Sequence, residues 1–136
     1  MRHKVETTLP DGTMATMIGG ILSGDGAITV GEKTYQVARS VMSDGTRGVA
    51  DYAIGGAFMG LPSASVNDLE QKRSFKLRQR RIWSSTLSLL EGDIEIGDFR
   101  SNCLQSPYRI RVDVGVSTEI VLLCIWVVMV RMAFVA

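Results

Sequence analysis

The chain has 136 residues, of which 46% are hydrophobic and 21% charged, and its formal net charge is +1. This length fits one domain over residues 1–136, and the composition is close to the globular average, which excludes an intrinsically disordered chain. A net charge near zero gives no overall field that attracts nucleic acid or an anionic membrane, so an electrostatic partner must recognise a local cluster.

The N-terminal residues and the cysteines bear on the cellular compartment. The first residues, MRHKVETTLPDGT, contain no continuous apolar stretch, so no secretory signal peptide is expected. Cys103 and Cys124 lack metal-ligand spacing, and Cys124 lies in an apolar run where it is expected to pack as a small hydrophobe. Since no disulfide is expected, we predict a reducing, cytoplasmic location.

Turn residues divide the first two thirds of the chain into short segments, a spacing that favours β-strands. The candidate turns are Pro10-Asp11-Gly12, Gly24-Asp25-Gly26, Asp44-Gly45 and Glu91-Gly92-Asp93. Ala27–Val30 and Lys33–Arg39 are predicted to form a hairpin across Gly31-Glu32. Val49–Leu61 is apolar and interrupted by glycines, which is compatible with a strand pair or with a short packed helix.

The next segments alternate between apolar and polar residues. We interpret Pro62–Glu70 as a polar connector because it is rich in Ser, Asn and Asp. Three later segments alternate between apolar and polar residues. Phe75 and Leu77 alternate with Lys76 and Arg78, and Ile94 and Ile96 flank Glu95. In the third segment the apolar Tyr108, Ile110, Val112 and Val114 alternate with Arg109, Arg111 and Asp113. Each predicted strand therefore has one solvent-exposed polar face and one apolar face, and another element must cover the apolar face.

The terminal run, Ile120–Ala136 (IVLLCIWVVMVRMAFVA), is the only long segment able to cover that face. Ser117 or Thr118 can cap a helix there, and Glu119 suits the first turn. Seventeen residues reach roughly 25 Å as a helix, less than the roughly 30 Å of a bilayer core. We favour a helix over about residues 118–135 that the strands enclose. A membrane helix and a central buried strand remain open as alternatives.

The second half of the chain resembles a known superfamily. The stretch from Ser74 (SFKLRQRRIWSSTLSLLEGDIEIGDFR), the alternating strand after it and the final run LLCIWVVMV are similar to the tubby C-terminal-like superfamily. The likeness is to small bacterial LURP-one-related and phospholipid scramblase-like proteins. Its features are the basic, aromatic strand Phe75–Trp83, the turn Gly92-Asp93, the pair Ile96-Gly97 and Trp126, within the last 63 residues.

The resemblance implies a fold and a type of function. The implied fold is mainly β (β-rich α+β), a partial or closed antiparallel β-barrel that encloses a hydrophobic C-terminal helix, with a strand-rich part over residues 1–116. At 136 residues the chain is short for the full barrel of larger members. Tubby domains bind phosphoinositide headgroups through basic surface residues, and scramblases act on phospholipids. The implied role is therefore non-catalytic and membrane-associated.

One basic cluster could contact such a lipid. It comprises six cations in ten residues: Lys72, Arg73, Lys76, Arg78, Arg80 and Arg81. On a strand, Lys76, Arg78 and Arg80 share one face, and each cation near an anionic membrane contributes about 1 kcal/mol. We predict anionic-phospholipid contacts at Lys76, Arg78, Arg80 and Arg81. The alternative is a solvated strand face that discourages edge pairing. No nucleic-acid-binding signature accompanies these residues, so no nucleic-acid partner is expected.

No catalytic, metal or cofactor site is predicted, and the chain is not expected to be an enzyme. His3 is the only histidine and is placed in a frayed terminus, which leaves no Ser-His-Asp or Cys-His arrangement. Asp93, Glu95 and Asp98 are expected to be solvated rather than metal-bound. The glycine-rich GGILSGDG lacks the Lys-Ser/Thr of a phosphate-binding loop. Two other functions stay open: a tail-anchored membrane protein with a small cytosolic β domain, and a structural or protein-interaction module.

Overall fold

The computed structural model describes residues 2–20, 25–58, 61–79, 86–101, 107–113 and 115–128. These residues form eleven strands followed by one helix. They are β1 (Arg2–Thr8), β2 (Met14–Gly20), β3 (Gly26–Val30), β4 (Lys33–Ala38), β5 (Val41–Ser43), β6 (Gly48–Phe58), β7 (Leu61–Asp68), β8 (Arg73–Gln79), β9 (Thr86–Glu91), β10 (Ile94–Ser101), β11 (Pro107–Val112) and α1 (Thr118–Trp126). The mainly β class expected from the sequence is confirmed.

All eleven strands belong to one antiparallel sheet, in which each strand pairs with its neighbours in the sequence. Gly31 and Gly92, in the turns after β3 and β9, have φ values of +58° and +63°. Glycine adopts such values without a Cβ clash, so both turns can be short. The predicted hairpin across Gly31-Glu32 is confirmed, with Val30 opposite Lys33.

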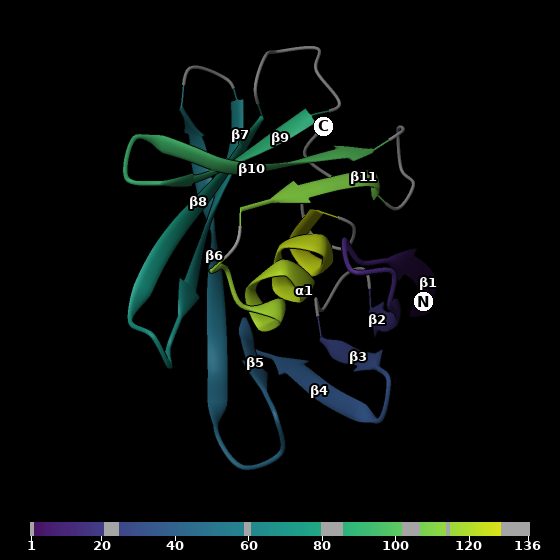
Figure 1. Ribbon diagram of the computed structural model, residues 1–136. Helices are drawn as coiled ribbons and strands as arrows, with labels where there is room; N and C mark the ends of the chain where they lie inside the picture. Colours follow the sequence, from purple (N-terminus) through teal and green to yellow (C-terminus); the bar gives the residue numbers. More distant parts are fainter. Residues whose placement is uncertain are drawn as a thin grey trace.

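The sheet curves around α1, which lies on its concave side (Figure 1). β1 and β11 are the outermost strands, and they contact each other without pairing among the described residues. The sheet is therefore an open wrap around the helix, and the described residues do not close it into a barrel.

The core lies between the concave face and α1. Alternating residues of the strands point inward, as Phe75 and Leu77 do on β8, and every residue from Ile120 to Val128 is buried in the same cluster. Full burial of one large aliphatic or aromatic side chain contributes about 1.5–3 kcal/mol relative to exposure. Because strands surround the helix, all of its angular positions can contribute, which explains why α1 has no polar face.

Ser117 caps α1, as the sequence suggested. Its hydroxyl accepts a hydrogen bond from Ile120 N at 3.3 Å, which satisfies one of the free amides at the start of the helix. The described helix spans Thr118–Trp126, and residues 129–135 of the predicted range lie outside the described part. The enclosed helix is confirmed for Ile120–Val128. None of the helices in the described part is long and apolar enough to cross a membrane.

Trp126 is fully buried, and two glycines make room for its indole ring. A Cβ atom built on Gly19 of β2 would lie 2.3 Å from Cη2 of the indole, and one on Gly26 of β3 would lie 2.6 Å from the same atom. Real Cβ atoms do not approach other atoms so closely. The glycine-rich GGILSGDG segment thus contributes two residues that allow the ring to reach the sheet.

One structural interpretation of the sequence was wrong, and one open choice is now decided. The supposed polar connector Pro62–Glu70 is mostly strand β7, in which Ala64 and Val66 point inward and Ser63, Ser65 and Asn67 alternate with them. The open choice at Val49–Leu61 is decided in favour of strand, since β6 spans Gly48–Phe58. The polar outer face of β7 was mistaken for a loop, because only two residues of this segment, Ala64 and Val66, point inward and neither is large.

The N-terminus and β10 also differ from expectation. His3 lies in β1, opposite Gly19, and not in a frayed terminus. On β10 the register shifts between Glu95 and Gly97, so Ile96 is the extra residue of a β-bulge. Ile94 is 70% exposed at the hairpin tip, whereas Ile96 is buried. A β-bulge of this kind inserts one extra residue and reverses the alternation beyond it.

Candidate functional site

The predicted lipid contacts lie on β8, whose inner and outer faces are clearly separated. Phe75 and Leu77 are buried, whereas Lys76 and Arg78 are exposed. On β7, Ser65 is paired with Lys76 and Ser63 with Arg78. Both cations therefore project from the outer face of the sheet next to small hydroxyl side chains that leave their head groups accessible.

Only part of the predicted set can be placed. Lys76 and Arg78 lie two residues apart on the same face, as predicted. Arg80 and Arg81 lie outside the described residues. Within the described part of the chain, neither Lys76 nor Arg78 forms an ion pair or a side-chain hydrogen bond.

Arg73, at the start of the same strand, has a structural role instead. Its Nε and Nη2 donate hydrogen bonds to the two carboxylate oxygens of Glu91, each at 2.8 Å, and its Nη1 donates to the Gly115 carbonyl at 2.8 Å. The guanidinium also lies 5.0 Å from the centre of the Phe75 ring. The hydrogen bonds from Arg73 hold the pKa of the Glu91 carboxyl below its usual value. Arg73 thus ties β8 and β9 to the segment before α1.

A second charged group lies on the outer face of β10 and β11. Arg111 Nη2 is 3.2 Å from Asp98 Oδ2 and 3.7 Å from Glu95 Oε2, and Arg111 Nη1 is 3.7 Å from Asp113 Oδ1. The Glu95 carboxylate also accepts a hydrogen bond from Ser88. The acidic residues Glu95 and Asp98 are therefore part of one paired group, in which Glu95 is exposed and Asp98 is buried, so the expected solvation of Asp98 is wrong. Among the described residues, no cluster of three or more potential metal ligands occurs.

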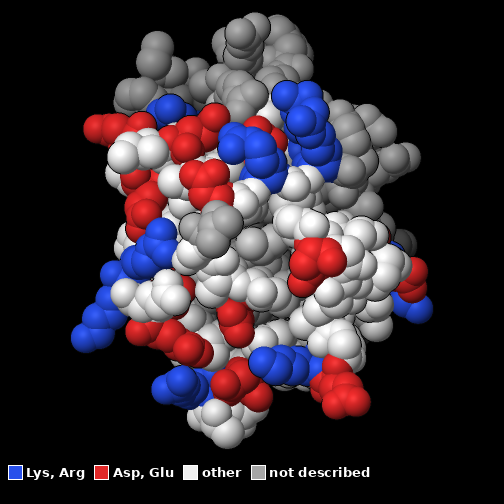
Figure 2. All heavy atoms as spheres, in the orientation of Figure 1, with Lys and Arg blue, Asp and Glu red and all other residues white. Residues whose placement is uncertain are grey.

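Sequence reasoning missed an arginine pair beside this group. Arg100 on β10 is directly opposite Arg109 on β11. The alternation of Arg109 with Ile110 in the sequence indicated an outward cation, but the residue across from it depends on a strand register that the sequence does not reveal. Figure 2 shows Lys and Arg side chains gathered over β10 and β11 near the top of this view.

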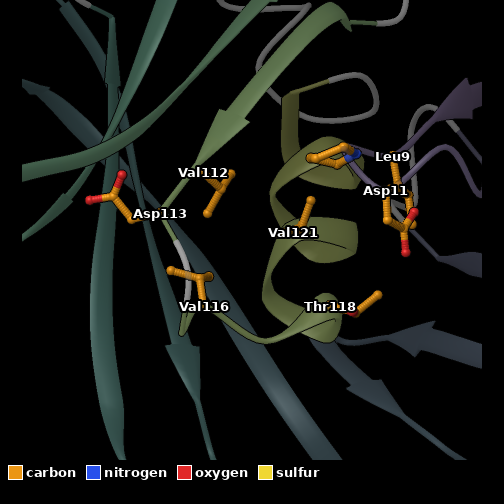
Figure 3. A pocket seen from close by; sticks show the side chains of 8 residues that line it. Leu9, Asp11, Val112, Asp113, Val116, Thr118 and Val121 are labelled. Atoms are coloured by element: carbon orange, nitrogen blue, oxygen red, sulfur yellow. The ribbon is translucent and has the colours of Figure 1, made fainter.

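A small pocket of about 140 Å³ lies between the β1–β2 turn, the end of β11 and the start of α1 (Figure 3). Its apolar lining includes Leu9, Val112 and Val121. Of the acidic residues at its rim, Asp113 points away from Val121 in Figure 3. Asp11 accepts a hydrogen bond from Thr13 N at 2.9 Å, which lowers the pKa of its carboxyl. This pocket lacks converging polar groups, so it does not indicate a catalytic site.

Polar contacts fix the N-terminal end of α1. The Ser117 hydroxyl donates to Asp68 Oδ2 at 3.3 Å, and the Tyr35 hydroxyl donates to Glu119 Oε1 at 3.1 Å. Burial of the phenol and the nearby Glu119 carboxylate raise the pKa of Tyr35 to about 12. These contacts join α1 to β4 and to the end of β7. They position the start of the helix against the sheet.

Cys124 is a free, fully buried cysteine in α1. Burial raises the pKa of its thiol, because the thiolate would lose its solvation. The expected packing of Cys124 as a small hydrophobe agrees with its position in the core. Cys103 lies outside the described residues.

Comparison with known proteins gives no relative: no family model, no curated protein and no solved structure matches the chain. Function must therefore be argued from the surface just described.

Proposed function

We propose that this chain is a non-catalytic, tubby-like domain that binds anionic phospholipid headgroups weakly through the outer face of β8. Lys76 and Arg78 supply the contacts that can be placed, and Arg80 and Arg81 complete the proposed set. The resulting role is that of a membrane-associated accessory protein. In this proposal the sheet acts as a partial barrel, which shields the apolar α1 and presents cations on its outside.

The observation that carries the proposal is the exposure of Lys76 and Arg78 on one face, without an acidic partner among the described residues. Each exposed cation loses part of its hydration when it contacts a headgroup, but it has no ion pair to break. Each contributes about 1 kcal/mol at an anionic surface. Two such residues support weak, salt-sensitive binding and not stable anchoring.

The position of β8 within the sheet also favours a ligand contact over the simplest alternative. Charged residues often protect an edge strand from pairing with other chains. β8 is paired with β7 on one side and with β9 on the other. Its cations therefore do not serve as edge protection, and that part of the alternative is wrong.

Liposome co-sedimentation tests the proposal, with vesicles of phosphatidylcholine alone and vesicles that also contain phosphatidylserine. The parent protein should sediment only with the anionic vesicles. The double variant Lys76→Gln/Arg78→Gln should bind about thirtyfold more weakly, because two contributions of about 1 kcal/mol are lost. Adding Arg80→Gln and Arg81→Gln should weaken binding further.

The matched control is Lys33→Gln/Arg47→Gln, which removes the same charge from exposed positions on other strands and turns. Lys33 begins β4, and Arg47 is 67% exposed and 3.6 Å from Glu70. This control should keep most of the parent's binding. Equal binding by the β8 double variant and the parent would reject the proposed surface, and equal losses in both double variants would reduce the effect to net charge.

A further inference from the structure

Arg100 and Arg109 form a cross-strand pair of like charges on the outer face of the sheet. They are direct partners in the β10–β11 register. Phe99, the neighbour of Arg100, is fully buried, and Ile110, the neighbour of Arg109, packs against the core. Directly opposite residues in an antiparallel pair have Cβ atoms about 4.5–5.5 Å apart, and like charges in this position repel each other.

The nearby acidic residues do not relieve this repulsion. Arg111, the next outward residue on β11, already pairs with Glu95, Asp98 and Asp113. Among the described residues, neither Arg100 nor Arg109 forms an ion pair. Arg100 Nε is in addition buried without a hydrogen-bond partner. A buried N–H donor of a charged group is normally paired, so Arg100 is held at a cost in this arrangement.

The chemistry that offsets two adjacent like charges is an anion with several acceptor oxygens. Guanidinium groups present planar forks of N–H donors that match phosphate oxygens two at a time. One oxyanion between the two forks would offset the repulsion between the guanidinium groups. A single carboxylate has two oxygens and less charge, so a phosphate group with three free oxygens fits the pair better.

We propose that Arg100 and Arg109 form a clamp for a phosphate-type oxyanion on the outer face of β10 and β11. The clamp is distinct from the lipid surface on β8 and does not depend on it. The phosphate can belong to a soluble phosphomonoester or to a lipid with a phosphomonoester headgroup, and both present the same terminal group.

Isothermal titration calorimetry with inorganic phosphate tests the clamp directly. The parent protein should bind one phosphate. Arg109→Gln should raise the Kd about tenfold or more, as expected when charge-assisted hydrogen bonds from one guanidinium are lost. Arg109→Lys keeps the charge and removes the fork, so its Kd should lie between those two. Lys33→Gln is the control for net charge and should bind as the parent does.

Thermal unfolding gives a second test, because the increase in Tm with phosphate distinguishes binding at the clamp from a general effect of surface charge. Without phosphate, Arg109→Gln should be at least as stable as the parent, because it removes the repulsion. With phosphate, the parent's Tm should rise more than that of the variant, whereas the general salting-out effect of phosphate acts on both proteins alike. Arg100→Lys, which removes the buried Nε–H but keeps the charge, should lose the same phosphate-dependent increase.

Vesicles containing phosphatidic acid distinguish the two sources. Sedimentation of the parent with these vesicles, reduced by Arg109→Gln, identifies a lipid headgroup, whereas phosphate binding without sedimentation identifies a soluble ligand. Either result supports the clamp. Absence of phosphate binding by the parent, or equal binding by the parent and Arg109→Gln, overturns it. Lys76→Gln/Arg78→Gln should leave the calorimetric Kd for phosphate unchanged, so failure of the β8 surface and failure of the clamp can be told apart.

Discussion

Replacing Gly19 with alanine should strongly destabilise the protein, because the new methyl group would collide with Trp126. The added Cβ would lie 2.3 Å from indole Cη2, and ordinary contacts begin at 3.4 Å, so the atoms must separate by 3.4 − 2.3 = 1.1 Å. The ring is fully buried, and Gly26 lies against the same atom. Overpacking of this kind costs about 1–3 kcal/mol, more than the roughly 0.5–1 kcal/mol that alanine gains over glycine within a strand.

Urea unfolding of a double-mutant cycle measures this collision. Gly19→Ala should lower the free energy of unfolding by up to about 2.5 kcal/mol in the parent, which is the overpacking cost reduced by the gain of alanine over glycine. Trp126→Phe removes the ring atoms that collide, so Gly19→Ala should cost much less in that background, with a coupling energy of at least about 0.5 kcal/mol. Trp126→Phe also removes an indole N–H that is buried without a partner, a group that costs about 1–3 kcal/mol to bury.

Trp126→Ala measures how much the whole indole ring contributes to the free energy of unfolding. It should cost about 3–5 kcal/mol, since the cavity it leaves is in the centre of the core. Phenylalanine should therefore be clearly better tolerated than alanine. A neutral Gly19→Ala, or equal effects of Gly19→Ala in the parent and in Trp126→Phe, would refute the argument that the two glycines exist to accommodate the ring.

Three further predictions concern the helix and its polar contacts. Ser117→Ala should lower the free energy of unfolding by about 1 kcal/mol in urea, because the N-cap and the bond to Asp68 are both lost; an unchanged midpoint would contradict this. The pKa of Tyr35 is raised to about 12 in the folded protein, so the stability that its protonated hydroxyl contributes is complete below pH 10 and should be lost as the pH rises through 12. Tyr35→Phe should therefore reduce the loss of stability in unfolding curves measured at alkaline pH. The buried Cys124 thiol should react with a disulfide reagent only as fast as the protein unfolds, which peptide mapping can follow; rapid labelling of the native protein would show that the core is accessible.

The strand-rich class and several inward and outward faces could be predicted from the sequence because they depend on local patterns. The alternation at Phe75–Arg78 assigned both faces of β8 correctly, and the turn residues Gly31-Glu32 located a hairpin. The period of two along a strand and the backbone freedom of glycine act within a few residues, so they can be read before the fold is known.

The candidate site could be predicted only in part. Lys76 and Arg78 were found because charge density is visible in a linear sequence. The Arg100–Arg109 pair was missed, since the register between β10 and β11 brings together residues whose partners no local pattern specifies. The bulge in β10 was missed for the same reason, because the extra residue Ile96 is defined only by the pairing of β10 with β9.

The sequence by itself determined that the chain is mainly β, and it favoured an apolar helix with a capped start after the strands. Both properties follow from periodicity, turn chemistry and capping, which operate over short distances along the chain. Only the tertiary structure decided what surrounds the helix: the sheet curves around Ile120–Val128, and Gly19 and Gly26 admit the Trp126 ring. The apolar run has the same hydrophobicity whether lipid or protein covers it, so the choice depends on contacts between residues far apart in the sequence.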